Sequence, residues 1–162
     1  MKYFIFCILF YISSALAESP SQSIEVVLDQ LHTAAAKADG KLYFSLFSEN
    51  AVYIGTDAKE TWTLEQFRQF AEPYFSKGKG WTYTATQRHV YLSQGGDTAW
   101  FDELLWNSKY GVCRGTGVLE RIKGQWKIAQ YHLTIPIPNE LADDIVKQIK
   151  EPVSVDKKNQ KN

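Results

Sequence analysis

The spacing of apolar residues changes about halfway along the chain. Between residues 23 and 77, apolar side chains mostly recur every three or four positions, which is typical of helices with one buried face. From Trp81 to Pro138, β-branched and aromatic residues instead gather in strand-length runs separated by glycine-containing turns. This order predicts a helix-rich first half followed by an antiparallel sheet.

The first half is predicted to contain three helices and one strand. The expected elements are a helix from Ser23 to Asp39, a short helix over 42–47, a strand over 51–57 and a helix from Thr63 to residue 77. In the first helix Ile24, Leu28 and Leu31 lie on one face, and Ser23 can cap its start. Thr63 and Gln66 have the spacing of a capping box, which indicates where the third helix begins.

The second half is predicted to fold as a meander of four strands, closed by a short helix. The strands are expected over 81–93, 97–107, 112–122 and 125–135. Pro136 and Pro138 end the last strand, and Asn139 can cap a helix that carries Leu141 and Ile145 on one side. We expect no repeat and no second domain.

The N-terminus has the pattern of a secretory signal peptide. Lys2 precedes an apolar run over 3–12, and small residues end in Ala15-Leu-Ala17, so cleavage is expected after Ala17. The run is shorter than the roughly 20 residues that a membrane span needs. The sequence therefore predicts a signal peptide over 1–17, one domain over 18–150 and a polar, disordered tail over 151–162. The mature protein is expected to be exported, to the periplasm or outside the cell.

Composition and charge limit the classes of partner. Hydrophobic residues make up 44% of the chain and aromatic residues 14%, enough for one packed core. Eighteen Lys and Arg balance eighteen Asp and Glu, so no electrostatic argument favours nucleic acid or an anionic membrane. Once Cys7 is removed with the signal peptide, Cys113 has no partner for an intramolecular disulfide. The histidines lack metal-ligand spacing and no cofactor motif is present, so neither a metal nor a cofactor is expected.

Three segments resemble the SnoaL-like branch of the nuclear transport factor 2 superfamily. They are residues 38–57 (ADGKLYFSLFSENAVYIGTD), 95–100 (GGDTAW) and 126–136 (WKIAQYHLTIP). The resemblance implies an α+β, cone-shaped (cystatin-like) fold, in which N-terminal helices pack in a curved antiparallel sheet. It also implies a largely apolar pocket at the mouth of the cone and a homodimer formed through the outer face of the sheet. Members of this superfamily include isomerases, dehydratase-like enzymes, cyclases, ligand binders and assembly modules, so the fold does not choose among these functions.

Strand alternation separates candidate pocket residues from candidate interface residues. Phe101 and Glu103 share one face of their strand, while Asp102 lies on the other with Trp100 and Trp106. By analogy with the family, we expect Phe101, Glu103 and Tyr131 to line the pocket and Trp100, Trp106 and Trp126 to lie at the dimer interface. Tyr53, Trp62 and Arg114 complete the predicted ligand-binding set.

Catalysis in such a pocket would need a carboxylate or imidazole that titrates near neutral pH. Asp102, Glu103 and His132 are the candidates, with either acid as general base and Tyr131 or His132 as polarising donor. The alternative for the acids is a buried ion pair with Arg88 or Arg114 from another strand. Three functions therefore remain open: binding of a small apolar molecule, cofactor-independent isomerase, dehydratase or cyclase chemistry, and a dimeric protein-interaction module.

Overall fold

The computed structural model describes residues 19–150 of the chain. The predicted signal peptide and the predicted C-terminal tail lie outside the described residues. In chain order the elements are α1 (Pro20–Ala36), α2 (Gly40–Ser45), β1 (Phe47–Ile54), β2 (Thr61–Thr63), α3 (Leu64–Phe75), β3 (Thr84–Leu92), β4 (Thr98–Asn107), β5 (Gly111–Ile122), β6 (Gln125–Thr134), the 3₁₀ turn η1 (Asn139–Leu141) and α4 (Ala142–Lys150). All the predicted helices and strands are present, and the short strand β2 was not predicted.

Both long N-terminal helices begin at capping boxes. Thr63 and Gln66 exchange side-chain and backbone hydrogen bonds at the start of α3, as predicted. The first helix begins one turn earlier than predicted, because Ser19 and Gln22 form the box there and Pro20 occupies the first helical turn. Ser23, the predicted cap, therefore lies inside α1.

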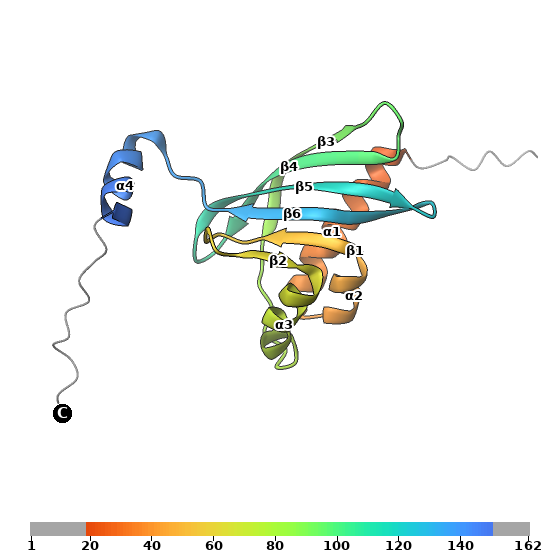
Figure 1. Ribbon diagram of the computed structural model, residues 1–162, viewed down its shortest axis with the longest axis horizontal. Coiled ribbons are helices and arrows are strands. Elements are labelled where there is room, and N and C mark those ends of the chain that lie inside the picture. Colours follow the sequence, from red (N-terminus) through yellow and green to blue (C-terminus); the bar gives the residue numbers. More distant parts are fainter. Residues whose placement is uncertain (1–18, 151–162) are drawn as a thin grey trace, which may run out of the picture.

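The six strands form one sheet with the order β2-β1-β6-β5-β4-β3. Neighbouring strands pair antiparallel except β1 and β6, which run parallel and bring the first strand of the chain beside the last (Figure 1). The α+β cone predicted from the sequence is confirmed, with this one parallel pair in an otherwise antiparallel sheet. The parallel pair places Tyr53 of β1 opposite Tyr131 of β6.

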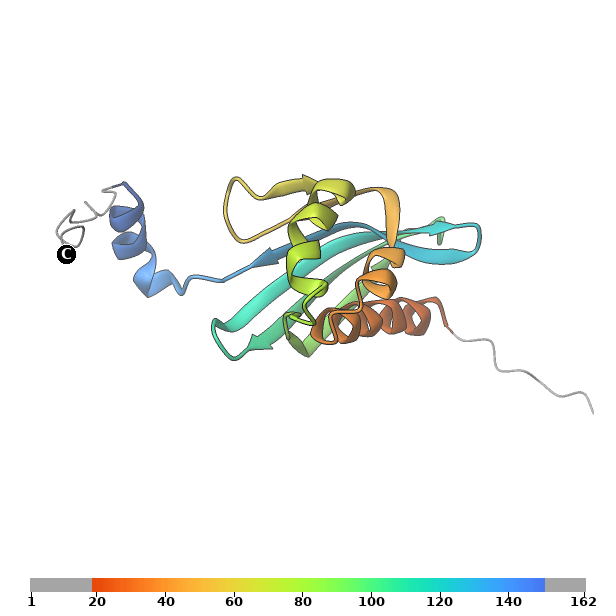
Figure 2. The same cartoon turned by 90° about the horizontal axis from the view of Figure 1, so that it is seen from below.

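Helices α1, α2 and α3 cover one face of the sheet, which we call the inner face (Figure 2). The core lies between these layers, with Ile24, Leu28 and Leu31 from α1 packed against β-sheet residues such as Leu105 and Ile128. The opposite, outer face carries no helix in either view, and Trp100 and Trp106 are about half exposed there. The two faces of the sheet are therefore in different environments.

Two β-bulges change which side chains point inward. In β3 an extra residue, Thr86, stands between the pairs made by Ala85 and Gln87, and in β6 Ala129 stands between Ile128 and Gln130. The β6 bulge turns both Trp126 and Tyr131 toward the inner face, although the two are an odd number of residues apart. The prediction that Trp126 lies on the outer face is wrong for this reason, since it assumed uninterrupted alternation.

The last helix stands apart from the rest of the protein. Pro136 and Pro138 lie in an extended segment that leads from β6 to η1 and α4, and both figures show α4 away from the sheet. None of its residues is buried. Within residues 19–150 no helix is both long enough and apolar enough to cross a membrane.

Candidate functional site

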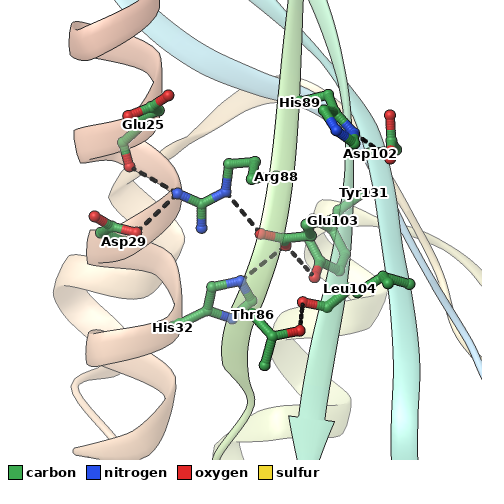
Figure 3. Close-up of polar contacts among 10 residues, drawn as sticks. All are labelled: Glu25, Asp29, His32, Thr86, Arg88, His89, Asp102, Glu103, Leu104 and Tyr131. Atoms are coloured by element: carbon green, nitrogen blue, oxygen red, sulfur yellow. Dashed lines mark hydrogen bonds and ion pairs between the residues drawn. The ribbon is translucent and has the colours of Figure 1, made fainter.

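A buried carboxylate, Glu103 of β4, lies at the centre of a polar cluster between α1 and the sheet (Figure 3). Its Oε1 accepts hydrogen bonds from His32 Nε2 at 2.8 Å and from the Tyr131 hydroxyl at 3.1 Å. Its Oε2 accepts one from Arg88 Nε at 2.9 Å. Three donors from α1, β3 and β6 thus converge on a single acid inside an otherwise apolar core.

Arg88 connects this acid to the surface of α1. Its Nη1 donates to Asp29 Oδ1 at 2.8 Å and lies 3.5 Å from the Glu25 carbonyl oxygen (Figure 3). Its Nη2 is buried and has no hydrogen-bond partner among residues 19–150. The guanidinium therefore neutralises Glu103, and one of its nitrogens, Nη2, is left without a partner inside the cluster.

The cluster stabilises the ionised form of Glu103. Burial by itself would raise the pKa of this carboxyl, but the hydrogen bonds from His32 and Arg88 and the positive charge of Arg88 outweigh burial and lower it. Burial and the neighbouring Glu103 charge raise the pKa of Tyr131, so its hydroxyl keeps its proton and donates. Because an ionised carboxylate only accepts hydrogen bonds, His32 donates from Nε2, and in this tautomer of the ring Nδ1 is an acceptor.

A glycine makes room for this arrangement. Gly115 of β5 pairs with Glu103, and a Cβ at this position would lie 2.6 Å from the Tyr131 hydroxyl and 2.8 Å from Glu103 Oε1. Any side chain here would meet the hydrogen bond between those two residues. Close packing therefore explains the glycine at this position of β5.

An aromatic pocket opens beside the cluster, near the ends of β1 and β6. Its volume is about 280 Å³, and its walls are Tyr53, Gly55, Thr56, Glu60, Trp62, Phe67, Phe70, Trp81, Tyr83, Tyr110 and Leu133. Several rings are nearly parallel: Tyr53 and Phe67 lie 3.7 Å apart with planes at 12°, and Trp62 and Phe70 lie 4.9 Å apart at 22°. Such a stack provides flat apolar walls with few polar groups.

A much smaller cavity lies between the aromatic pocket and the cluster. It measures about 10 Å³ and is lined by Leu31, His32, Ala35, Tyr43, Tyr53, Trp81, Tyr83, Tyr131 and Leu133. Four of these residues, Tyr53, Trp81, Tyr83 and Leu133, also line the aromatic pocket, so the two spaces are neighbours. His32 and Tyr131 belong to both the small cavity and the Glu103 cluster, which links the acid to the pocket.

The structure brings together only part of the predicted site. Phe101, Glu103 and Tyr131 point inward, Tyr53 is stacked in the core and Trp62 forms a pocket wall. Three other predicted residues, Asp102, Arg114 and His132, occupy outer-face positions of β4, β5 and β6 and line neither the aromatic pocket nor the small cavity. Asp102 there contacts His89 Nδ1 at 3.1 Å and the Tyr91 hydroxyl at 3.3 Å.

Neither Asp102 nor Glu103 is placed to act as a general base on a molecule in the aromatic pocket. Asp102 lies on the wrong face of the sheet, and every oxygen of Glu103 already accepts a hydrogen bond. The predicted alternative, a buried ion pair with an arginine of another strand, is confirmed for Glu103 with Arg88. The arginine is Arg88 and not Arg114, because only Arg88 points inward after the β3 bulge.

Sequence reasoning missed His32 and Asp29, the two side chains that α1 contributes to the cluster. His32 follows Leu28 by four positions, and it therefore continues the buried stripe of the helix. That spacing was a usable signal, because a polar residue on a buried helical stripe needs a partner. No comparable signal marked Trp81 and Tyr83, which precede β3 in an irregular segment.

Comparison with known proteins agrees with this architecture. The model of the SnoaL-like domain family matches residues 24–138. Among curated proteins no sequence matches the chain.

Solved structures with similar folds have very different sequences. A nuclear transport factor 2-like protein of unknown function from Pseudomonas putida KT2440 shares 17% identity at a TM-score of 0.61, over 75% of this chain and 92% of that one. A candidate dehydratase of the same family from Streptomyces avermitilis shares 13% identity at a TM-score of 0.61, over 74% and 100%. A candidate aromatic ring hydroxylase from Novosphingobium aromaticivorans shares 18% at a TM-score of 0.60, over 72% and 88%. At these identities the likeness establishes the fold alone.

Proposed function

Because this chain belongs to the SnoaL-like domain family, whose fold is often used to hold small molecules, we propose that it binds a small, largely apolar organic molecule in the aromatic pocket. The observation that carries the proposal is the set of nearly parallel rings around a space of about 280 Å³. Flat walls on this scale suit a planar molecule of one or two rings.

The chemistry of the pocket supports binding over turnover by an acid. Burial raises the pKa of Tyr53 and raises that of Tyr83 to about 12, so both hydroxyls stay neutral at physiological pH. The carboxylate of Glu103 is already occupied by its three donors. An apolar ligand would therefore meet mainly neutral aromatic surfaces, with Glu60 as the one acidic side chain among the described residues of the wall, and its main driving force would be the burial of its own surface.

The proposal can be tested by native mass spectrometry together with tryptophan fluorescence. We expect the purified protein to retain a small molecule, or to show quenching of Trp62 and Trp81 on titration with naphthalene. Phe70→Asp would place a charge in the pocket wall and abolish the effect, whereas Tyr74→Asp, at an equally exposed aromatic position on the same helix, would leave it unchanged. Equal responses of both variants and the wild type would contradict the proposal.

We also propose that the outer face joins two copies of the chain. Trp100, Trp106 and Val112 are each about half exposed on β4 and β5, and Tyr91 stacks on Trp100 beside them at 5.9 Å. Soluble monomers rarely leave large apolar side chains gathered on an open sheet face, and this face exposes two tryptophans. The faces of two copies could cover each other in an isologous contact.

Light scattering coupled to size-exclusion chromatography tests this contact. The wild type should elute as a dimer, and Trp106→Ser combined with Val112→Ser should give a monomer. Tyr74→Ser, an equally exposed aromatic residue on α3, is the matched control and should remain dimeric. A monomeric wild type would overturn the dimer and favour a different protein as the partner of this face.

Export remains a proposal that rests on the sequence of the first 17 residues. Its test is to determine the N-terminus of the protein recovered from cells. A chain that begins at Glu18 would support it, and a chain that keeps Lys2 would refute it.

A further inference from the structure

We propose that the small cavity beside His32 is a hydroxyl subsite, so that the ligand of the aromatic pocket is an aromatic ring carrying a hydroxyl group that donates a hydrogen bond to His32 Nδ1. This inference rests on the proposed binding function and names the chemical class of the ligand.

The size of the cavity sets the group that it accepts. A space of about 10 Å³ is close to the limit for a single water-sized probe, so it suits one oxygen atom and not a ring or a chain. The cavity shares Tyr53, Trp81, Tyr83 and Leu133 with the aromatic pocket. A planar ring in the larger space would therefore direct a substituent on its edge into the smaller one.

The polar wall of the cavity determines the direction of the hydrogen bond. Glu103 fixes the His32 tautomer by accepting from Nε2 at 2.8 Å, which leaves Nδ1 as an acceptor without a partner among residues 19–150 (Figure 3). The Tyr131 hydroxyl already donates to Glu103 at 3.1 Å. A ligand hydroxyl has the donor that Nδ1 requires, whereas a carbonyl oxygen or a carboxylate would face the lone pair of the ring.

The cluster holds this acceptor in place. Glu103 has no exposed side-chain surface and is itself fixed by Arg88, which is tied to Asp29 on the same helix as His32. The His32 ring is therefore held by its hydrogen bond to Glu103, and α1, which carries His32, is held by the ion pair between Arg88 and Asp29. Glu103 and Arg88 act as positioning residues in this scheme, and His32 is the ligand-contacting residue.

Two nearly isosteric probes separate this subsite from simple apolar binding. Calorimetric titration would compare 2-naphthol with 2-fluoronaphthalene, which has a similar shape but no donor. For the wild type we expect 2-naphthol to bind about tenfold more tightly, the ratio that corresponds to one hydrogen bond. The variant His32→Gln keeps an amide donor for Glu103 but lacks the acceptor at the Nδ1 position, so the ratio should fall to about one while the affinity for 2-fluoronaphthalene is retained.

Each result has a defined meaning. Equal binding of both probes by the wild type would overturn the hydroxyl subsite and leave the aromatic pocket intact. A preference for 2-naphthol that survives in His32→Gln would also overturn it, because another group would then hold the hydroxyl. Failure of both probes to bind would contradict the aromatic pocket and the subsite together. Retained affinity for 2-fluoronaphthalene in the variant serves as the control for correct folding.

Discussion

Arg88 and Glu103 face each other across β3 and β4 as cross-strand partners, and their side chains meet on the inner face of the sheet at 2.9 Å. The pair is almost completely buried, with 11% of the Arg88 side chain and none of the Glu103 side chain exposed. Each charge was removed from water, so each depends on the other and on the hydrogen bonds around it. The consequences for stability can be measured directly.

Removal of either charge should strongly destabilise the protein. Glu103→Leu leaves Arg88 buried without its main counter-ion, and we expect the free energy of unfolding in urea to fall by about 3–5 kcal/mol. The double variant Arg88→Met with Glu103→Leu should be more stable than the sum of the single effects predicts, by about 1–3 kcal/mol. Strict additivity would show that the two side chains do not interact as described.

Acid should weaken the protein through Glu103. Its pKa is lower in the folded protein than the value of about 4.3 expected in the unfolded chain. The resulting stabilisation is complete above the unfolded value and is lost as pH falls through the folded one. Urea unfolding between pH 7 and pH 3 should show this loss in the wild type and a shallower loss in Glu103→Gln. Asp102→Asn, at the neighbouring position on the outer face, should keep the wild-type slope.

The absence of a side chain at Gly115 should be essential to the cluster. Gly115→Ala would force a methyl group against the Tyr131 hydroxyl and Glu103 Oε1, which lie 2.6 and 2.8 Å from the added carbon. We expect a loss of about 1–3 kcal/mol in unfolding free energy from overpacking. Gly95→Ala is the control, because the nearest atom there is the end of the Asp97 side chain at 3.3 Å, and thermal unfolding should scarcely change.

The extra residue in β6 should be removable without turning the aromatic residues around it. Deletion of Ala129 would leave Trp126 and Tyr131 four positions apart, so regular alternation would still turn both inward. We expect near-ultraviolet circular dichroism to retain the signal of packed aromatic rings in this variant. Deletion of both Ala129 and Gln130 would leave them three positions apart, on opposite faces, and should lose that signal. Loss of the signal on deletion of Ala129 alone would contradict the role given to the bulge.

Regular elements could be predicted from the sequence, and irregular ones could not. Phe101 and Glu103 were placed correctly because β4 alternates without interruption from Thr98 to Asn107. Trp126 was misplaced because a bulge leaves no clear mark in the sequence, although it reverses the faces of a strand. The capping box at Thr63 was found, whereas the box at Ser19 lay just outside the apolar stripe used to start the first helix.

Only those residues of the candidate site that could be identified within a single strand were predictable from the sequence. Glu103 could be singled out as an acid within an apolar strand, and Arg88 as one possible partner. His32 was missed because its importance depends on the position of α1 over β4, a tertiary contact that helical periodicity does not fix. The aromatic pocket was found in part, through Tyr53 and Trp62, since its other walls come from several elements.

The close approach at Gly115 also has an evolutionary consequence. A larger residue can enter this position only when the acid at 103 or the hydroxyl at 131 has already been replaced by something smaller, because the three groups share one space. Among descendants of this sequence, these positions should therefore change together, and an isolated substitution at 115 should be eliminated by selection. The order of the changes matters: the carboxylate or the hydroxyl must be lost first, and only then can the glycine be replaced.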